Sequence, residues 1–416
     1  MKTSLLVACA VVLSAVSIQS ADGDKPAKPK PPTFLTVETA GPDYAVQGEY
    51  LNDWGGAQVI ALGEDRFRLV TFKGGLPGAG WDKETRSEIE GKRDGGKIVF
   101  AGKDGFKAEF AGGKITITTA NGGPYTMEKT SRTSPTLGAK APAGSVVLFG
   151  GNGAGEWSGG RTDDRGLLVA GATTKRKFQN FSLHIEFLLP FKPLGRGQDR
   201  GNSGVYLQDR YEVQVLDSFG LKGEDNECGG IYTKAKPAVN MCFPPLVWQT
   251  YDMDFQAAKF GADGKKTKNA VVTVKHNGVA IHENFEINGS TGGGQKEEAT
   301  PGPFQLQDQG TAVFYRNAWV VESYAAGREK KKGRRSFSSL FGSRAHKHAT
   351  GASRAQSSFV GRHSIPPLHQ RPCTKLVLNR IHRANPGREA PLQPGQIRPV
   401  NQPKRCGKFG GTLVEQ

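Results

Sequence analysis

The segment 196–220, RGQDRGNSGVYLQDRYEVQVLDSFG, concentrates side chains that could do chemistry on a polar ligand. It is typical of two β-strands joined by a tight turn, and side chains along a strand alternate between its two faces. Val205 must then lie beside Val213, because the apolar faces of the two strands would otherwise disagree. A three-residue loop gives this register and sets Tyr206 opposite Glu212, whereas a two-residue turn does not.

The polar face of this hairpin carries the candidate site. Around Gly204, which leaves open space, it presents Asn202, Tyr206, Glu212 and Gln214. A carboxylate, two amides and an aromatic ring around a gap suit a sugar, because the polar groups bond hydroxyls and the ring packs against C–H groups. A solvated face with ordinary cross-strand pairs is the alternative.

Two further clusters offer reactive side chains. In LHIEFLL, His184 and Glu186 share one face, and an imidazole beside a carboxylate can act in general acid/base catalysis. A plain surface pair is the alternative. In FYRNAWV, Arg316 could anchor a carboxylate such as Glu212 or Asp217, or a ligand oxygen, or serve only as a structural ion-pair partner.

The elements that must position these residues are β-strands. Within 35–129, short apolar runs alternate with glycine turns, which indicates a small β-meander domain. Within 145–325, the strand patterns continue, and the HNGV turn at Asn277-Gly278 is a strong hairpin signal. No segment there shows a convincing helical period, so two stacked antiparallel sheets are the natural arrangement.

The ends of the chain have other compositions. Residues 1–21 resemble a secretory signal peptide, with a charged start and an apolar core that is too short to span a membrane. We therefore expect a secreted or periplasmic protein without a membrane span. Residues 22–34 form a Pro/Lys-rich linker, and 130–144 a linker between the two domains.

The basic charge belongs to the tail, residues 326–416. From Arg328 onward the chain has 19 Lys and Arg against 3 Asp and Glu, which is nearly all of the net charge of +17. This composition predicts disorder. Such a tail could bind anionic surfaces non-specifically, but no motif indicates a specific nucleic-acid partner. A frame-shifted, non-native translation is another explanation of the tail.

The chain has five cysteines, of which Cys228 and Cys242 lie close together in sequence. In an oxidising compartment they are a disulfide candidate, and two buried free thiols are the alternative. No Cys/His spacing is typical of a zinc site. We therefore predict no metal ligands and no cofactor, although dependence on a divalent metal stays open.

The second domain resembles the 3-keto-disaccharide hydrolase domain family, a former domain of unknown function that is abundant in secreted proteins of planctomycetes and Bacteroidetes. The similar stretches run from about residue 145 to residue 322 and include LFGG, RKFQNFSLHIEFLLPF, NECGGIY and the most specific one, RGNSGVYL…YEVQVLDS. The 35–129 region, with VIALGEDRFRLVTFKGGLPGAGW, resembles the companion β domain of planctomycete proteins. The resemblance thus implies a planctomycete-type secreted protein.

The resemblance also implies a fold and a reaction. The fold is all-β: a concanavalin-like jelly-roll sandwich with a carbohydrate site, preceded by the smaller β-meander domain and followed by a disordered basic tail. The substrates are glycosides whose sugar has been oxidised at C3. The ketone acidifies the C2 proton, so that a base can remove it, the C1 group leaves by β-elimination, and water adds back. This needs a base, an acid and donors to the enolate.

One position departs from the family pattern. The family usually has LQDHG where this chain has LQDQG, so Gln309 replaces a histidine. Glutamine cannot take a proton near neutral pH. If the histidine is the base or a metal ligand, this chain is weakened or inactive; if it only orients a sugar, Gln309 can substitute.

The strand faces assign roles to the candidates. For proton transfer they are Glu212, His184 and Glu186, and for substrate binding Asn202, Tyr206, Gln214, Arg200, Arg316 and Gln309. The function that this predicts is a glycoside-cleaving enzyme, a hydrolase acting by elimination and hydration on 3-keto-glycosides or related carbohydrates. The alternative is a non-catalytic carbohydrate-binding module.

Overall fold

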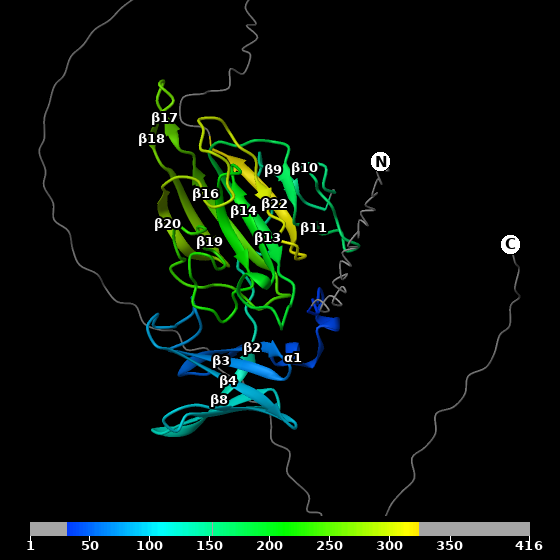
Figure 1. Ribbon diagram of the computed structural model, residues 1–416, viewed down its shortest axis with the longest axis vertical. Coiled ribbons are helices and arrows are strands. Elements are labelled where there is room, and N and C mark those ends of the chain that lie inside the picture. The colour runs from blue at the N-terminus through cyan, green and yellow to red at the C-terminus, as the bar shows by residue number, and fades with distance from the viewer. Residues whose placement is uncertain (1–30, 152, 324–416) are drawn as a thin grey trace, which may run out of the picture. The chain divides into compact units, whose positions relative to one another are not determined.

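The computed structural model describes residues 31–151 and 153–323 (Figure 1). The expected signal peptide, most of the Pro/Lys-rich linker and the basic tail lie outside the described residues. No helix in the described ranges is long and apolar enough to cross a membrane. The helical elements are a 3-10 turn η1 (Val37–Thr39), a helix α1 (Gly41–Val46) and a second 3-10 turn η2 (Gly197–Asp199).

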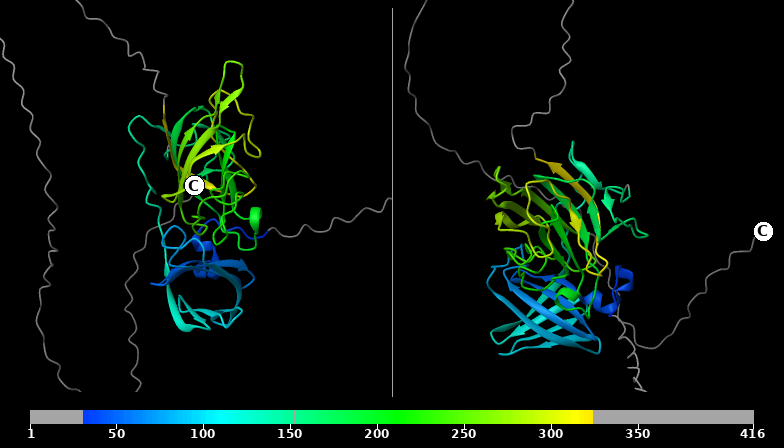
Figure 2. Two further views of the ribbon diagram at one scale, coloured as in Figure 1. Left: turned by 90° about the vertical axis from the view of Figure 1, so that its left-hand side faces the viewer. Right: turned by 45° about the horizontal axis from the view of Figure 1, so that its top comes forward.

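The first domain is a closed antiparallel β-barrel (Figure 2). The predicted meander closes on itself because the last strand pairs with the first, Glu49 lying opposite Thr130. Its strands, in barrel order, are β1 (Gly48–Leu51), β2 (Gly55–Gly63), β3 (Arg66–Lys73), β4 (Arg86–Asp94), β5 (Lys97–Ala101), β6 (Lys107–Ala111), β7 (Lys114–Thr119) and β8 (Gly122–Thr130).

The barrel is filled by one face of each strand, as alternation requires. Val59, Phe67 and Phe100 are fully buried inside it. β2 is buried along its whole length, because its outward Ile60 and Leu62 belong to the hydrophobic cluster that also forms the core of the second domain. This explains why β2 reads as a nearly continuous apolar run instead of an alternating one.

The second domain is a sandwich of two sheets, which confirms the predicted all-β architecture. The five-stranded sheet has the order β10 (Trp157–Ser158), β12 (Ala172–Thr174), β21 (Gln305–Leu306), β14 (Asn202–Leu207) and β15 (Tyr211–Leu216). The seven-stranded sheet has the order β11 (Leu168–Val169), β22 (Phe314–Glu322), β13 (Phe181–Leu188), β16 (Gln249–Gln256), β19 (Ala270–His276) and β20 (Val279–Ile287), with β9 (Val146–Phe149) also paired to β22. A separate small ribbon joins β17 (Lys259–Phe260) and β18 (Lys266–Lys268).

The register of the hairpin β14–β15 is the predicted one. Val205 pairs with Val213, and Tyr206 pairs with Glu212. The connection is the expected three-residue loop, in which Gln208 and Asp209 adopt left-handed backbone angles, with φ of 56° and 58°. The two valines are fully buried in the core between the sheets, so the neighbouring side chains of each strand must project from the other face of the five-stranded sheet.

Candidate functional site

A cavity of about 270 Å³ lies on the face of the five-stranded sheet that points away from the core. Four of the residues predicted from the sequence line it: Tyr206, Glu212, Gln214 and Gln309. The alternation of side chains along the two hairpin strands puts the first three on this face. Gln309 reaches the cavity from the chain that follows β21. Polar side chains from both strands of one hairpin therefore converge on one hollow.

Glu212 is the principal ionisable group of this cavity. Its side chain is only 2% exposed, and burial raises its pKa to about 7, although a hydrogen bond from Tyr206 acts in the opposite direction. The carboxylate lies over Gly204, where an added Cβ would be 2.1 Å from Oε1 of Glu212. The space that this glycine leaves is thus filled by the carboxylate itself.

The Tyr206 hydroxyl can serve both protonation states of Glu212. It lies 2.8 Å from Oε2 of Glu212 and 2.8 Å from the carbonyl oxygen of Gly292, and it accepts a bond of 3.2 Å from Gln307 Nε2. Its single proton goes to Glu212 when the carboxylate is ionised. When Glu212 is protonated, Glu212 can donate to Tyr206 and Tyr206 to Gly292. Neither state leaves the buried carboxyl without a partner, which suits a group that must gain and lose a proton.

Gln198, on η2, is a further amide side chain of the site, and the sequence did not predict it. Its Oε1 accepts hydrogen bonds of 3.1 Å from Gln214 Nε2 and from Asn202 Nδ2. Asn202 is 5% exposed and also bonds the Gln198 backbone carbonyl at 3.0 Å, so it holds Gln198 in place and does not itself line the cavity. Strand alternation gives no signal for Gln198, because it lies in a turn before β14.

The remaining walls come from loops far along the chain. They are Tyr232, Gly292, Gly293 and Gln307. An added Cβ at Gly293 would lie 2.9 Å from the Tyr206 hydroxyl, and its φ is +75°, so this position requires glycine. The only sequence signal for this wall is the run of glycines in STGGG, which indicates a turn but no particular neighbour.

His184 and Glu186 are not part of this cavity. They lie on β13 in the other sheet, and because their neighbours Leu183 and Ile185 fill the core, they project from the opposite side of the sandwich. His184 Nδ1 lies 2.6 Å from Asp252 Oδ1. The structure thus separates the three residues proposed for proton transfer into two clusters.

The cluster around Glu186 binds the linker between the domains. Its carboxylate accepts bonds from the backbone N–H of Gly138, from Asn317 Nδ2 at 2.8 Å and from Arg316 Nε at 2.7 Å. Burial alone would raise the pKa of Glu186, but the neighbouring His184, whose Nε2 lies 3.6 Å from Oε1, and these donors together lower it to about 2. A permanently ionised, fully bonded carboxylate is a structural anchor and a poor base.

The two predicted arginines also lie elsewhere. Arg316 pairs with Glu186 and stacks over the Trp248 ring at 3.8 Å, so the expected pairing with Glu212 or Asp217 does not occur. Arg200 forms a buried ion pair with Asp217 at 2.7 Å. Both arginines are structural partners of carboxylates outside the cavity.

Cys228 and Cys242 are buried free thiols, so the predicted disulfide is not formed. Cys228 Sγ lies 3.3 Å from the Tyr251 hydroxyl, and Cys242 Sγ lies 3.5 Å from the carbonyl oxygen of Leu216, so both are placed as members of the hydrogen-bonded core. In the described ranges, no group of three or more His, Cys, Asp or Glu side chains is arranged to hold a metal ion.

Comparison with known proteins identifies relatives of the second domain. Residues 144–321 match the model of a family described as 3-keto-alpha-glucoside-1,2-lyase-like domain. A candidate glycosyl hydrolase from Parabacteroides distasonis is 33% identical, over 44% of this chain and 85% of that chain, with a TM-score of 0.41. A second candidate glycosyl hydrolase from the same organism is 17% identical, over 44% of this chain and 94% of that chain, with a TM-score of 0.33. A comparison with curated proteins found no match.

Proposed function

Because the chain belongs, through residues 144–321, to the family of 3-keto-alpha-glucoside-1,2-lyase-like domains, we propose that it cleaves glycosides whose sugar carries a ketone at C3. The family supports a carbohydrate-acting hydrolase in general. The observation that carries the finer proposal is Glu212, a buried carboxyl group with a pKa of about 7 on the wall of a polar cavity. A general base works best when its pKa lies near the working pH.

The proposed reaction begins with proton transfer from C2 of the sugar to Glu212. The electron pair of the C–H bond passes into an enolate with the C3 ketone. The enolate then re-forms the ketone, a C1–C2 double bond forms, and the C1–oxygen bond breaks, so that the leaving group departs as an alcohol after taking up a proton. Water adds its hydroxyl to C1 and a proton returns to C2, which completes a net hydrolysis.

The other polar groups of the cavity have supporting roles. The amides of Gln198, Gln214 and Gln307 can donate to the enolate oxygen or to sugar hydroxyls, which stabilises charge as it develops. Gln309 lies on the same cavity and acts as a hydrogen-bonding residue that orients the sugar. Since Glu212 supplies the base, this role does not require the histidine that the family usually has at that position.

The proposal is tested with 3-keto-glucosides and the purified protein. We expect release of free sugar, with exchange of the C2 proton for solvent deuterium visible by NMR, and loss of both in Glu212→Gln. Parallel assays with and without a chelator test metal dependence. Glycan binding with no turnover and no exchange in either form would instead support the non-catalytic carbohydrate-binding module.

The place of action is part of the same proposal. A signal-like segment at residues 1–21 supports export, so the enzyme would act outside the cytoplasm. Fractionation of cells expressing the full chain tests this, and retention of the protein in the cytoplasm would contradict it.

A further inference from the structure

The β-barrel is open at one end. Four of the loops that connect consecutive strands lie at this end: 52–54, 74–85, 102–106 and 120–121. Two adjoining hollows, of about 430 Å³ and 560 Å³, open at this end and share Thr71, Ser87 and Phe106 in their walls. We propose that this end, here called the barrel mouth, is a second carbohydrate-binding site, which takes neutral oligosaccharides and is independent of the Glu212 cavity.

The inward-facing side chains of the barrel change from apolar to polar toward the mouth. Along β3 the inward positions run from Phe67 and Leu69, which are fully buried, to Thr71. Along β4 they run from Ile89 to Ser87, and Ser87 pairs directly with Thr71. Among the residues that the structure describes, neither hydroxyl has a hydrogen-bond partner. A pair of free hydroxyls at the rim of an apolar core is suited to bonding a ligand that carries hydroxyls itself.

Two aromatic rings stand at the same end. Trp54 is 76% exposed and Tyr125 is 41% exposed, and both line the mouth. Large exposed rings are uncommon on a folded surface and often mark binding sites. In a sugar site they pack against the C–H faces of the pyranose ring, while neighbouring polar groups bond its hydroxyls.

The exposed tryptophan is held on a rigid turn. Asn52 Oδ1 accepts hydrogen bonds of 3.0 Å from the backbone N–H of Trp54 and of Gly55, and the Trp54 carbonyl accepts one of 3.1 Å from Gly74. The backbone beneath the ring is thus fixed from both sides. A fixed backbone lowers the conformational entropy that this segment would lose when a ligand packs on the ring, which favours binding.

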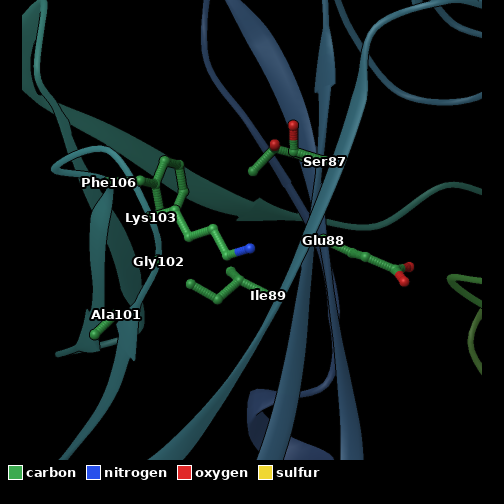
Figure 3. Close-up of a pocket in the computed structure, with 8 residues that line it drawn as sticks. Ser87, Glu88, Ile89, Ala101, Gly102, Lys103 and Phe106 are labelled. Atoms are coloured by element: carbon green, nitrogen blue, oxygen red, sulfur yellow. The ribbon is translucent and has the colours of Figure 1, made fainter.

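The charged groups at the mouth can also bond a ligand with hydroxyl groups, because Lys73 and Lys103 line the two hollows and their ammonium groups are donors. Figure 3 shows the Lys103 ammonium reaching toward Ser87 and Ile89, where it can donate to a hydroxyl. Among the described residues that line the two hollows, Glu88 is the one carboxylate, and it points away from that ammonium and pairs with Arg86 at 3.0 Å. The hydroxyls, the ammonium and the rings therefore face the opening together.

The test uses the full chain with Glu212→Gln, so that no turnover disturbs the measurement. Binding of a panel of soluble neutral oligosaccharides is measured by calorimetry, with Trp54→Ala and Tyr125→Ala as test variants. We expect at least one oligosaccharide to bind and each substitution to weaken its binding about tenfold, which is the size expected for loss of one stacking ring. Val147→Ala, which removes a side chain that is 41% exposed on β9, is the matched control and should bind as before.

Two results would overturn the proposal. One is that no neutral oligosaccharide binds. The other is that binding is unchanged in Trp54→Ala and Tyr125→Ala but is lost in Gln214→Ala, because the sugar would then occupy the Glu212 cavity. Melting temperatures of the variants show that a loss of binding is not a loss of folding. Neither result depends on whether the Glu212 cavity catalyses the proposed reaction.

Discussion

Replacing Glu212 with glutamine should remove a loss of stability that the wild-type protein undergoes between pH 4 and pH 8. The folded pKa of Glu212, about 7, lies above its ordinary value of 4.5, because burial penalises the charged form. The stability that this group contributes is therefore fully present below pH 4.5 and is lost as the pH rises through 7. Glutamine does not titrate, so the variant lacks this loss.

The size of the effect follows from the two pKa values. A difference of one pKa unit is worth about 1.4 kcal/mol, so the rise from 4.5 to about 7 corresponds to about 3 kcal/mol of unfolding free energy between pH 4 and pH 8. Any cost of the substitution that does not depend on pH adds a constant offset. Only the change of the difference with pH therefore reports on Glu212.

The assay is urea denaturation followed by tryptophan fluorescence at pH values from 3 to 8, with Glu186→Gln as the matched control. Glu186 is the same residue type in the same domain and is also buried, but its pKa is lowered to about 2. Its contribution is present above pH 4.5 and is lost as the pH falls toward 2. Glu186→Gln should therefore lose stability relative to wild type as the pH rises from 3, the opposite direction to Glu212→Gln.

A difference between wild type and Glu212→Gln that stays the same from pH 4 to pH 8 would refute the reasoning. It would mean that the carboxyl group titrates as it does in water, so that burial does not perturb it. The assignment of Glu212 as a base for neutral pH would then lose its physical support, whatever the activity of the variant.

Three other substitutions test the same geometry. Tyr206→Phe removes the bond that lowers the pKa of Glu212, so the midpoint of the kcat/KM profile against pH should move upward; an unmoved midpoint argues against that base. Gly204→Ala places a Cβ 2.1 Å from the Glu212 carboxylate and should reduce kcat/KM by at least about 100-fold, whereas Gly96→Ala, in open space, should leave it unchanged. His184→Ala should lower the unfolding free energy by about 2–3 kcal/mol with little change in kcat/KM, and a large loss of activity in a folded variant would restore a catalytic role for His184.

The sequence predicts the candidate hairpin well because the relevant signal is local. Val205 and Val213 are a few residues apart, and only one register buries both, so the faces of Tyr206 and Glu212 follow directly. The same kind of signal gives the strands of the barrel. It does not give the closure between β8 and β1, which joins segments about 80 residues apart.

The sequence fails where the answer depends on which sheet a strand joins. The alternation of side chains along β13 correctly puts His184 and Glu186 on a polar face. It does not say which sheet β13 joins, and β13 pairs with β16 and β22 instead of with the hairpin. Loop residues are missed for a related reason. Gln198 enters the site through a turn, where no periodicity exists to indicate its direction.

The contrast between Glu186 and Glu212 shows how one fold gives two buried glutamates opposite properties. Both lose contact with water, and burial alone would raise the pKa of each. At Glu186 several hydrogen-bond donors contact the charged carboxylate, among them Gly138 of the linker and Asn317 of β22. At Glu212 the Tyr206 hydroxyl is the one side-chain donor to the carboxylate within the described part of the chain, and it can turn to another acceptor. The fixed donors therefore hold Glu186 ionised as an anchor, whereas Glu212, with fewer donors against the cost of burial, is left able to exchange a proton near neutral pH.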